Sequence, residues 1–206
     1  MIMDVNLTLI LLASLVAVAS PGPSTMAIAG TSMGSGRVAG LTLASGIMIG
    51  SFFWSISAAL GLSAVMMAHA WLFEVMRYAG TAYLLFLAYK SAKSALSPKQ
   101  MQPRAVAGNR KTVFLRGVAL HITNPKAILF FGSLYALGMP ANATAQQLGL
   151  VIAAVGLQSA LVFHGYALLF STPAMTRKYI NLRRWFEGAF AIGFGLAGFK
   201  ILTARL

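Results

Sequence analysis

The residues of this chain that could do chemistry gather at two interruptions of otherwise apolar stretches. The first is SPGPS at residues 20–24, and the second is HITNPKAILFF at residues 121–131. Proline removes a backbone N–H and clashes with the carbonyl one turn back, so it frees polar backbone groups from a helix. Inside a bilayer such groups need a protein partner or a cavity. The two stretches therefore predict two broken helices whose exposed backbone lines a binding cavity.

At the first interruption the predicted binding residues are Pro21, Gly22, Pro23, Ser24 and Thr25. Two prolines around a glycine predict a break rather than a mild kink. Carbonyls freed in the preceding turn would suit an ammonium group. The N–H groups that open the next helix would suit a carboxylate, since helix N-termini favour anions. The alternative is a structural kink that only shapes the packing of the helix.

At the second interruption the predicted binding residues are Asn124, Pro125 and Lys126. Lys126 is about a dozen residues into its apolar run, or ~18 Å along a helix at 1.5 Å per residue. A lysine near the middle of a membrane costs about 2.5–3.5 kcal/mol and usually faces a cavity or a partner. Its ammonium could bind a substrate carboxylate, or it could extend toward the membrane surface. Asn124 either satisfies the backbone that Pro125 exposes or contacts the substrate.

Three titratable residues are candidates for proton coupling: Glu187, His121 and His164. Glu187 stands just inside the last apolar run, where it could pair with Lys126, relay protons or form a salt bridge near the membrane surface. A histidine titrates close to neutral pH and could couple transport to protons. The alternative for both histidines is a hydrogen-bonded packing role.

Composition places these residues in a membrane protein. Of 206 residues, 58% are hydrophobic and 9% are charged, with a mean hydropathy of +0.78, whereas soluble domains carry about 25% charged residues. We therefore expect one membrane domain, 1–206, with the lipid bilayer as its partner. The net charge of +13 sits in short segments between apolar runs, so we expect no nucleic-acid binding. The absence of cysteine excludes disulfides and thiolate metal sites, and we expect neither metal nor cofactor.

Six apolar runs are long enough to span a membrane if interruptions are allowed. They are residues 5–33, 39–66, 70–90, 113–138, 145–170 and 184–204. Most of the 16 Lys and Arg residues fall in or beside the first, third and fifth loops. Basic loops face the cytoplasm, so we expect both termini in the periplasm. The N-terminus lacks the basic region of a signal peptide and has Asp4 instead, which predicts a retained first span.

The order of features repeats in two halves, 1–92 and 113–206, joined by a cytoplasmic linker, 93–112. Each half begins with a broken span and continues with two unbroken ones. Three spans per half give the halves opposite orientations in the membrane. The predicted fold is therefore an all-α integral membrane protein of six transmembrane helices, an inverted 3+3 repeat with helices 1 and 4 broken. Paired interrupted helices are typical of a transporter binding site near the bilayer midplane.

Two other functions fit single features of the sequence. The segment GTSMG at residues 30–34 fits G-x-S-x-G, so Ser32 with His121 or His164 could form an intramembrane hydrolase. That motif carries meaning only between a strand and a helix, whereas here it belongs to an apolar helix. We therefore expect no enzyme. The second alternative is a membrane subunit that transports nothing.

The two interruptions also resemble the motifs of a known family, the LysE/RhtB amino-acid exporters of bacteria. The resemblance rests on SPGP at 20–23, Phe114 with Gly117, NPKA at 124–127, and the pair 130–131. The segments NPKAILFFGSLYAL and MTRKYINLRRWFEGAFAIGFG are similar to the threonine-efflux branch. The resemblance implies an inner-membrane, multi-pass exporter of a small neutral or hydroxy amino acid, threonine or homoserine first, driven by the proton motive force. Glycine-rich faces fit packing within one chain or between the protomers of a homodimer.

Three positions depart from the family pattern. Ser24 stands where the family usually has Asp or Asn, and His121 stands where a small or aliphatic residue is expected. LYALGMP replaces the L-P-Q-F that commonly follows the fourth span. These departures bear on the substrate rather than on the fold.

Overall fold

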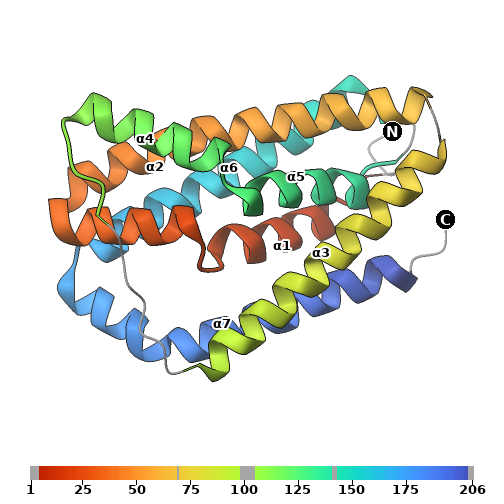
Figure 1. The fold of residues 1–206 in the computed structure, drawn as a ribbon. Coiled ribbons are helices and arrows are strands. Elements are labelled where there is room, and N and C mark those ends of the chain that lie inside the picture. The colour runs from red at the N-terminus through yellow and green to blue at the C-terminus, as the bar shows by residue number, and fades with distance from the viewer. Residues whose placement is uncertain (1–4, 69, 98–104, 141–142, 204–206) are drawn as a thin grey trace.

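The structure, a computed structural model, describes residues 5–68, 70–97, 105–140 and 143–203. Within these residues it consists of helices and short connections, without strands (Figure 1). The helices are α1 (Leu7–Ala19), α2 (Pro23–Ala68), α3 (Ala70–Leu96), α4 (Arg110–Ile122), α5 (Pro125–Gly138), α6 (Ala145–Phe170) and α7 (Pro173–Thr203). Both termini and part of the predicted linker, 98–104, lie outside the described residues. The expected all-α class is confirmed.

The first predicted break is present between α1 and α2. Ser20 caps α1 in an extended conformation, φ −69° and ψ 142°, and its N–H donates to the Val16 carbonyl. The chain then runs without helix until Pro23, the first residue of α2. Proline suits that position because its missing N–H would have no partner in the first turn. The SPGP motif therefore ends one helix and begins the next.

Helix α2 contains a turn of its own at Gly36. Its φ of 82° and ψ of 175° are not helical, and glycine adopts a positive φ without the steric cost that a Cβ imposes. The turn divides α2 into a first arm, residues 23–35, and a second arm, residues 37–68. Figure 1 shows the first arm running out to one end of the molecule and the second arm running back. The first predicted loop is thus a tight turn, directly followed by Arg37.

The second predicted break separates α4 from α5. Only Thr123 and Asn124 lie between the two helices. The Asn124 side chain caps α5 by accepting a hydrogen bond from the Lys126 backbone N–H at 3.0 Å, and Pro125 occupies the first helical position. The break falls where the NPK sequence predicts it.

The helix that contains the last predicted span begins about three turns before that span. We expected the span at residue 184, whereas α7 begins at Pro173. The intervening segment, 173–183, contains three basic residues. Lys and Arg are good helix formers. The basic residues therefore interrupt the apolar run, but the helix continues through them. Helix α6 coincides with the predicted fifth span.

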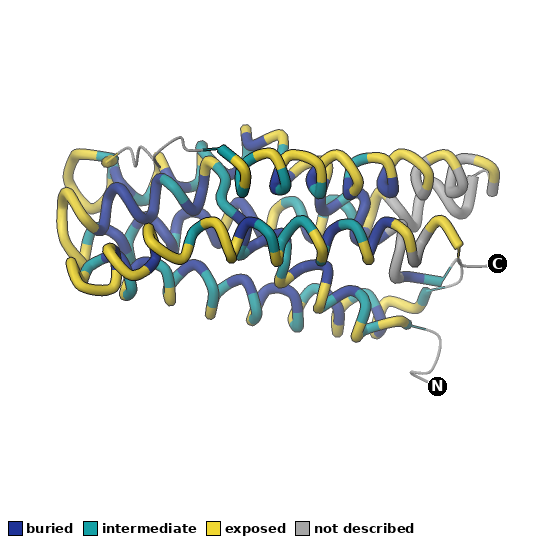
Figure 2. The backbone as a smooth tube through the Cα atoms, turned by 90° about the horizontal axis from the view of Figure 1, so that it is seen from below, coloured by how far each residue is buried: buried dark blue, intermediate teal, exposed yellow. Residues whose placement is uncertain are grey.

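The helices pack into a bundle with an apolar exterior. One group consists of the second arm of α2 together with α4 and α6. In the other group, α3 packs on α7 and on α5. Figure 2 shows exposed residues on the outside and buried residues between the helices. Large apolar side chains with at least 65% exposure lie on that outside: Leu60, Leu96, Leu157, Leu161, Trp185, Ile192 and Leu196. Apolar patches of this extent suit contact with lipid. Two helical stretches of the described chain, Pro23–Gly61 and Ala145–Phe170, are long and apolar enough to cross a membrane by themselves.

Candidate substrate-binding site

The two breaks meet through Lys126. From the first turn of α5, its Nζ donates to the Ser20 carbonyl oxygen at 2.9 Å and to Ser20 Oγ. The Lys126 side chain lies so close to Gly22 that an added Cβ there would be 3.2 Å from its Cδ. Glycine at this position therefore gives the lysine access to the first break. Residues 106 positions apart form one site.

The ammonium of Lys126 has only neutral hydrogen-bond partners among the described residues. Both acceptors of Lys126 Nζ are oxygens of Ser20, and the ion pair of Glu187 is with Arg183. A cation without a carboxylate in direct contact usually faces a cavity or a water-filled path in a membrane protein. Lys126 is therefore placed to receive an anionic group.

Two cavities adjoin at the breaks. The large cavity has a volume of about 490 Å³, which is within the range of roughly 300–1,000 Å³ for small-molecule sites. The small cavity has a volume of about 30 Å³. Four residues line both cavities: Ser20, Gly22, Asn124 and Lys126. All eight predicted binding residues line at least one of the two, since Pro21, Pro23 and Pro125 border the large cavity and Ser24 and Thr25 border the small one.

A chain of hydrogen bonds connects the second break to the first. Asn124 Nδ2 donates to Ser24 Oγ at 3.2 Å, and Ser24 Oγ lies 2.9 Å from Nδ1 of His121. All three side chains are buried. Two of the residues that depart from the family pattern, Ser24 and His121, are therefore in direct contact.

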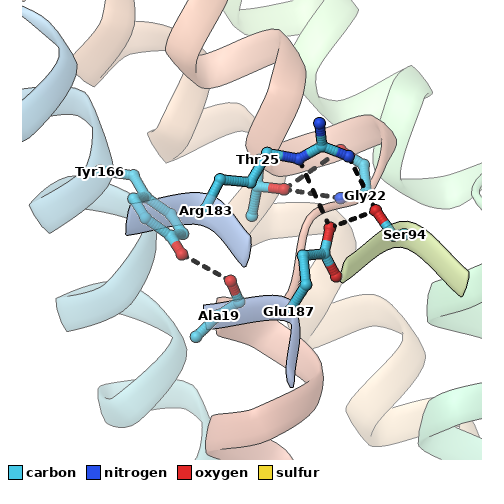
Figure 3. A network of polar contacts seen from close by, with 7 residues as sticks. All are labelled: Ala19, Gly22, Thr25, Ser94, Tyr166, Arg183 and Glu187. Atoms are coloured by element: carbon cyan, nitrogen blue, oxygen red, sulfur yellow. Dashed lines mark hydrogen bonds and ion pairs between the residues drawn. The ribbon is translucent and has the colours of Figure 1, made fainter. Parts of the chain in front are cut away.

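The carbonyls of the first break already have partners within the chain. Tyr166 on α6 donates to the Ala19 carbonyl (Figure 3), and Lys126 donates to the Ser20 carbonyl. Thr25 Oγ1 donates to the Gly22 carbonyl at 3.1 Å and accepts from the Gly22 N–H at 2.9 Å (Figure 3). We expected the carbonyls near Val18 and Ala19 to be available for a substrate ammonium, and that of Ala19 is taken by Tyr166. The contact from Tyr166 could not be read from the sequence, because it spans 147 positions.

Glu187 belongs to a polar cluster that lines the large cavity. Ser94 Oγ donates to Glu187 Oε1 at 2.8 Å and accepts from Arg183 Nη2 at 2.8 Å. Arg183 Nε lies 3.9 Å from the same carboxylate oxygen (Figure 3). The structure shows a salt bridge of Glu187 with Arg183 rather than with Lys126, and a role of Glu187 in proton relay stays a prediction. Sequence reasoning missed Ser94, although the i,i+4 spacing of Arg183 and Glu187 is a usable signal for their contact.

The other candidate residues lie elsewhere. His164 is 3.1 Å from Ser45 Oγ and 2.9 Å from the Ala160 carbonyl, and it lines neither of the two cavities. Ser32 is buried in α2, and its Oγ has no hydrogen-bond partner. The pairing of Ser32 with a histidine that the hydrolase alternative requires is therefore not formed. Among the described residues there is no group of three His, Asp or Glu side chains that could hold a metal ion.

Comparison with known proteins places this geometry in a family. Residues 15–205 match the family described as LysE type translocator, so the chain belongs to the LysE family of amino-acid efflux transporters. This confirms the resemblance seen in the SPGP and NPKA motifs. No solved structure matches the chain.

Individual relatives are similar over most of their length. The threonine efflux proteins of Salmonella typhi and Escherichia coli K12 are 31% and 30% identical over 188 residues, which cover 88% of this chain and 91% of each relative. The leucine efflux protein of Enterobacter sp. strain 638 is 31% identical over 188 residues, covering 90% of this chain and 89% of the relative. These relatives are efflux proteins, and the chain is not an enzyme.

Proposed function

We propose that this protein is a secondary transporter that exports a small amino acid, threonine or homoserine first, from the cytoplasm. One observation carries the proposal. The ammonium of Lys126 lies where the two broken helices meet, borders a cavity of about 490 Å³, and has only neutral oxygens as partners. A substrate carboxylate would supply the missing negative charge. Relatives named for threonine and for leucine efflux agree with an amino-acid substrate.

Two oppositely charged side chains that line the large cavity, Lys126 and Glu187, could bind the two charged groups of an amino acid. In this proposal the carboxylate binds Lys126 and the ammonium faces Glu187, which lines the same cavity. Glu187 is 4% exposed and is held in place by Ser94 and Arg183. Export is driven by the proton motive force, with Glu187 as the first candidate proton carrier, because it borders the substrate cavity. His121 and His164 are the other candidates.

The packing supports six spans in two inverted halves. The first span comprises α1 and the first arm of α2, and the fourth comprises α4 and α5. Spans at corresponding positions of the two halves pack on each other: the second arm of α2 on α6, and α3 on α7. Such pairing is expected when a pseudo-two-fold axis relates the halves. With the basic loops in the cytoplasm, both termini face the periplasm of a bacterial inner membrane.

The large cavity is bordered on one side by polar residues near the linker end of α3 and the first turns of α7, among them Lys90, Ser94 and Arg183. In the proposed topology these residues face the cytoplasm. The structure thus fits a state that accepts substrate from inside the cell. Movement of the two halves against each other would then open the site to the periplasm.

Export from cells tests this function. Cells with and without the protein are fed threonine-containing dipeptides, and internal and external amino acids are followed over minutes. We expect faster appearance of threonine outside and a smaller pool inside. If another amino acid leaves faster instead, the exporter stands and the substrate is wrong. If no amino acid leaves faster despite confirmed membrane insertion, the protein is not an amino-acid exporter, and the non-transporting subunit becomes the better explanation.

A further inference from the structure

His121, which lines the small cavity, has a polar atom without a partner. The proposed binding of the substrate carboxylate by Lys126 and of its ammonium by Glu187 gives this atom no role. Nε2 of His121 is buried and has no hydrogen-bond partner. The His121 side chain is 5% exposed and lines the small cavity. Buried polar atoms are almost always paired, so an unpaired one calls for an explanation such as an absent ligand.

The hydrogen bonds around His121 determine which of its nitrogens carries the proton. Asn124 Oδ1 accepts from the Lys126 N–H, so Asn124 Nδ2 is the atom that donates to Ser24 Oγ. The hydroxyl hydrogen of Ser24 then has an acceptor only if it points to His121 Nδ1. A neutral imidazole that accepts at Nδ1 carries its hydrogen on Nε2. Nε2 of His121 is therefore a donor without an acceptor.

Apart from its polar residues near the two breaks, the small cavity has mostly apolar walls. Its apolar walls come from three helices: Ala17 and Val18 on α1, Phe130 and Phe131 on α5, and Phe163 on α6. The small cavity has a volume of about 30 Å³, compared with about 490 Å³ for the large one. It therefore suits a short side chain such as that of threonine, which carries a hydroxyl and a methyl group on its β-carbon, better than the longer isobutyl group of leucine.

We propose that the small cavity receives the side chain of the exported amino acid and that Nε2–H of His121 donates to its hydroxyl oxygen. The inference rests on the proposed function, because Lys126 lines both cavities and would hold the carboxylate while the side chain enters the small one. His121 is then a specificity residue that selects hydroxy amino acids over apolar ones of the same shape. A site that hydrogen-bonds a substrate hydroxyl strongly rejects the analogue that lacks it.

Threonine and valine are the decisive pair, because they differ by a hydroxyl in place of a methyl. The purified protein is reconstituted in liposomes loaded with labelled threonine, valine or leucine, and release is compared between wild type, His121→Leu and His121→Gln. We expect wild type to release threonine at least about 10-fold faster than valine, and leucine slowest. His121→Leu should bring the threonine-to-valine ratio near one while valine is still released. His121→Gln retains an amide donor and should keep the ratio above that of His121→Leu.

A matched control comes from the second histidine–serine pair. His164→Leu removes a histidine that lines neither cavity. Whatever its effect on the overall rate of release, it should leave the threonine-to-valine ratio unchanged. A wild-type ratio below about 3 overturns the inference without any variant, and so does an equal loss of threonine and valine release in His121→Leu. If His121→Leu does not fold, the wild-type ratio and His121→Gln decide. Failure of wild type to release any amino acid refutes the proposed function instead.

Discussion

The two broken helices differ in what they present to the site. The first leaves an extended Ser20 and presents backbone carbonyls, which Tyr166 and Lys126 fill from other helices. The second is almost continuous, because the Asn124 N–H donates to the His121 carbonyl at 3.2 Å and the Thr123 N–H donates to the Ala119 carbonyl at 3.0 Å. The first break therefore supplies hydrogen-bond acceptors to the site. At the second break the backbone groups bond within their own helix, and the side chains supply donors.

This difference shows that two halves with the same order of features divide the chemistry between them. Lys126 of the second half donates to the acceptors of Ser20 in the first half. A carboxylate that binds Lys126 would compete with Ser20 for its ammonium. Substrate binding would in this way loosen a contact that joins the two halves. Variants that remove one side of this contact at a time can test the division of roles.

The largest effect is expected from Lys126→Ala. Hydrogen bonds to charged groups contribute about 1.5–3 kcal/mol, so export should fall by at least about 10- to 100-fold while the protein still reaches the membrane. Lys93→Ala is the matched control, since Lys93 is exposed on α3 and borders neither cavity, and it should export normally. Export rates are measured alongside the amount of protein in the membrane fraction. Normal export by Lys126→Ala would contradict the site.

A smaller effect is expected from Asn124→Ala, with Asn109→Ala as its counterpart. Both asparagines cap helices, Asn124 at α5 and Asn109 at α4, and loss of either cap should cost about 1 kcal/mol of stability. Only Asn124 also contacts Ser24 in the site. We expect similar drops in Tm for both variants and an export rate lowered about 2- to 10-fold for Asn124→Ala alone. Equal export rates in the two variants would reduce Asn124 to a capping role.

The smallest effect distinguishes the hydroxyls at the two breaks. Ser20→Ala removes one of two contacts of the Lys126 ammonium and leaves the carbonyl contact in place. Thr123→Ala removes an exposed hydroxyl that donates only to the Ala119 carbonyl of its own helix. We expect Ser20→Ala to change the export rate about 2- to 5-fold and Thr123→Ala to leave it unchanged. A stronger effect from Thr123→Ala would mean that the second break is more than a source of donors.

Local chemistry explains why so much of the fold could be predicted. Both breaks lie at their prolines, because proline acts on its own turn and on the residue before it. Helix α6 matches its apolar run, and the first loop forms at Gly36. Helix α7 begins earlier than the last predicted span, because the apolar run reports only the part that can lie in lipid and the helix also includes the basic segment from Pro173.

The amino-acid sequence by itself determined where the helices break and which residues border the breaks, since backbone geometry depends on near neighbours. Only the tertiary structure decided which partners those residues have. The contact of Lys126 with Ser20, of Ser24 with His121, and the cluster of Ser94 with Arg183 and Glu187 join positions about 90 to 106 residues apart. Such contacts depend on how whole helices pack. Packing is set by the sum of many side-chain contacts along each helix, and no short motif records that sum.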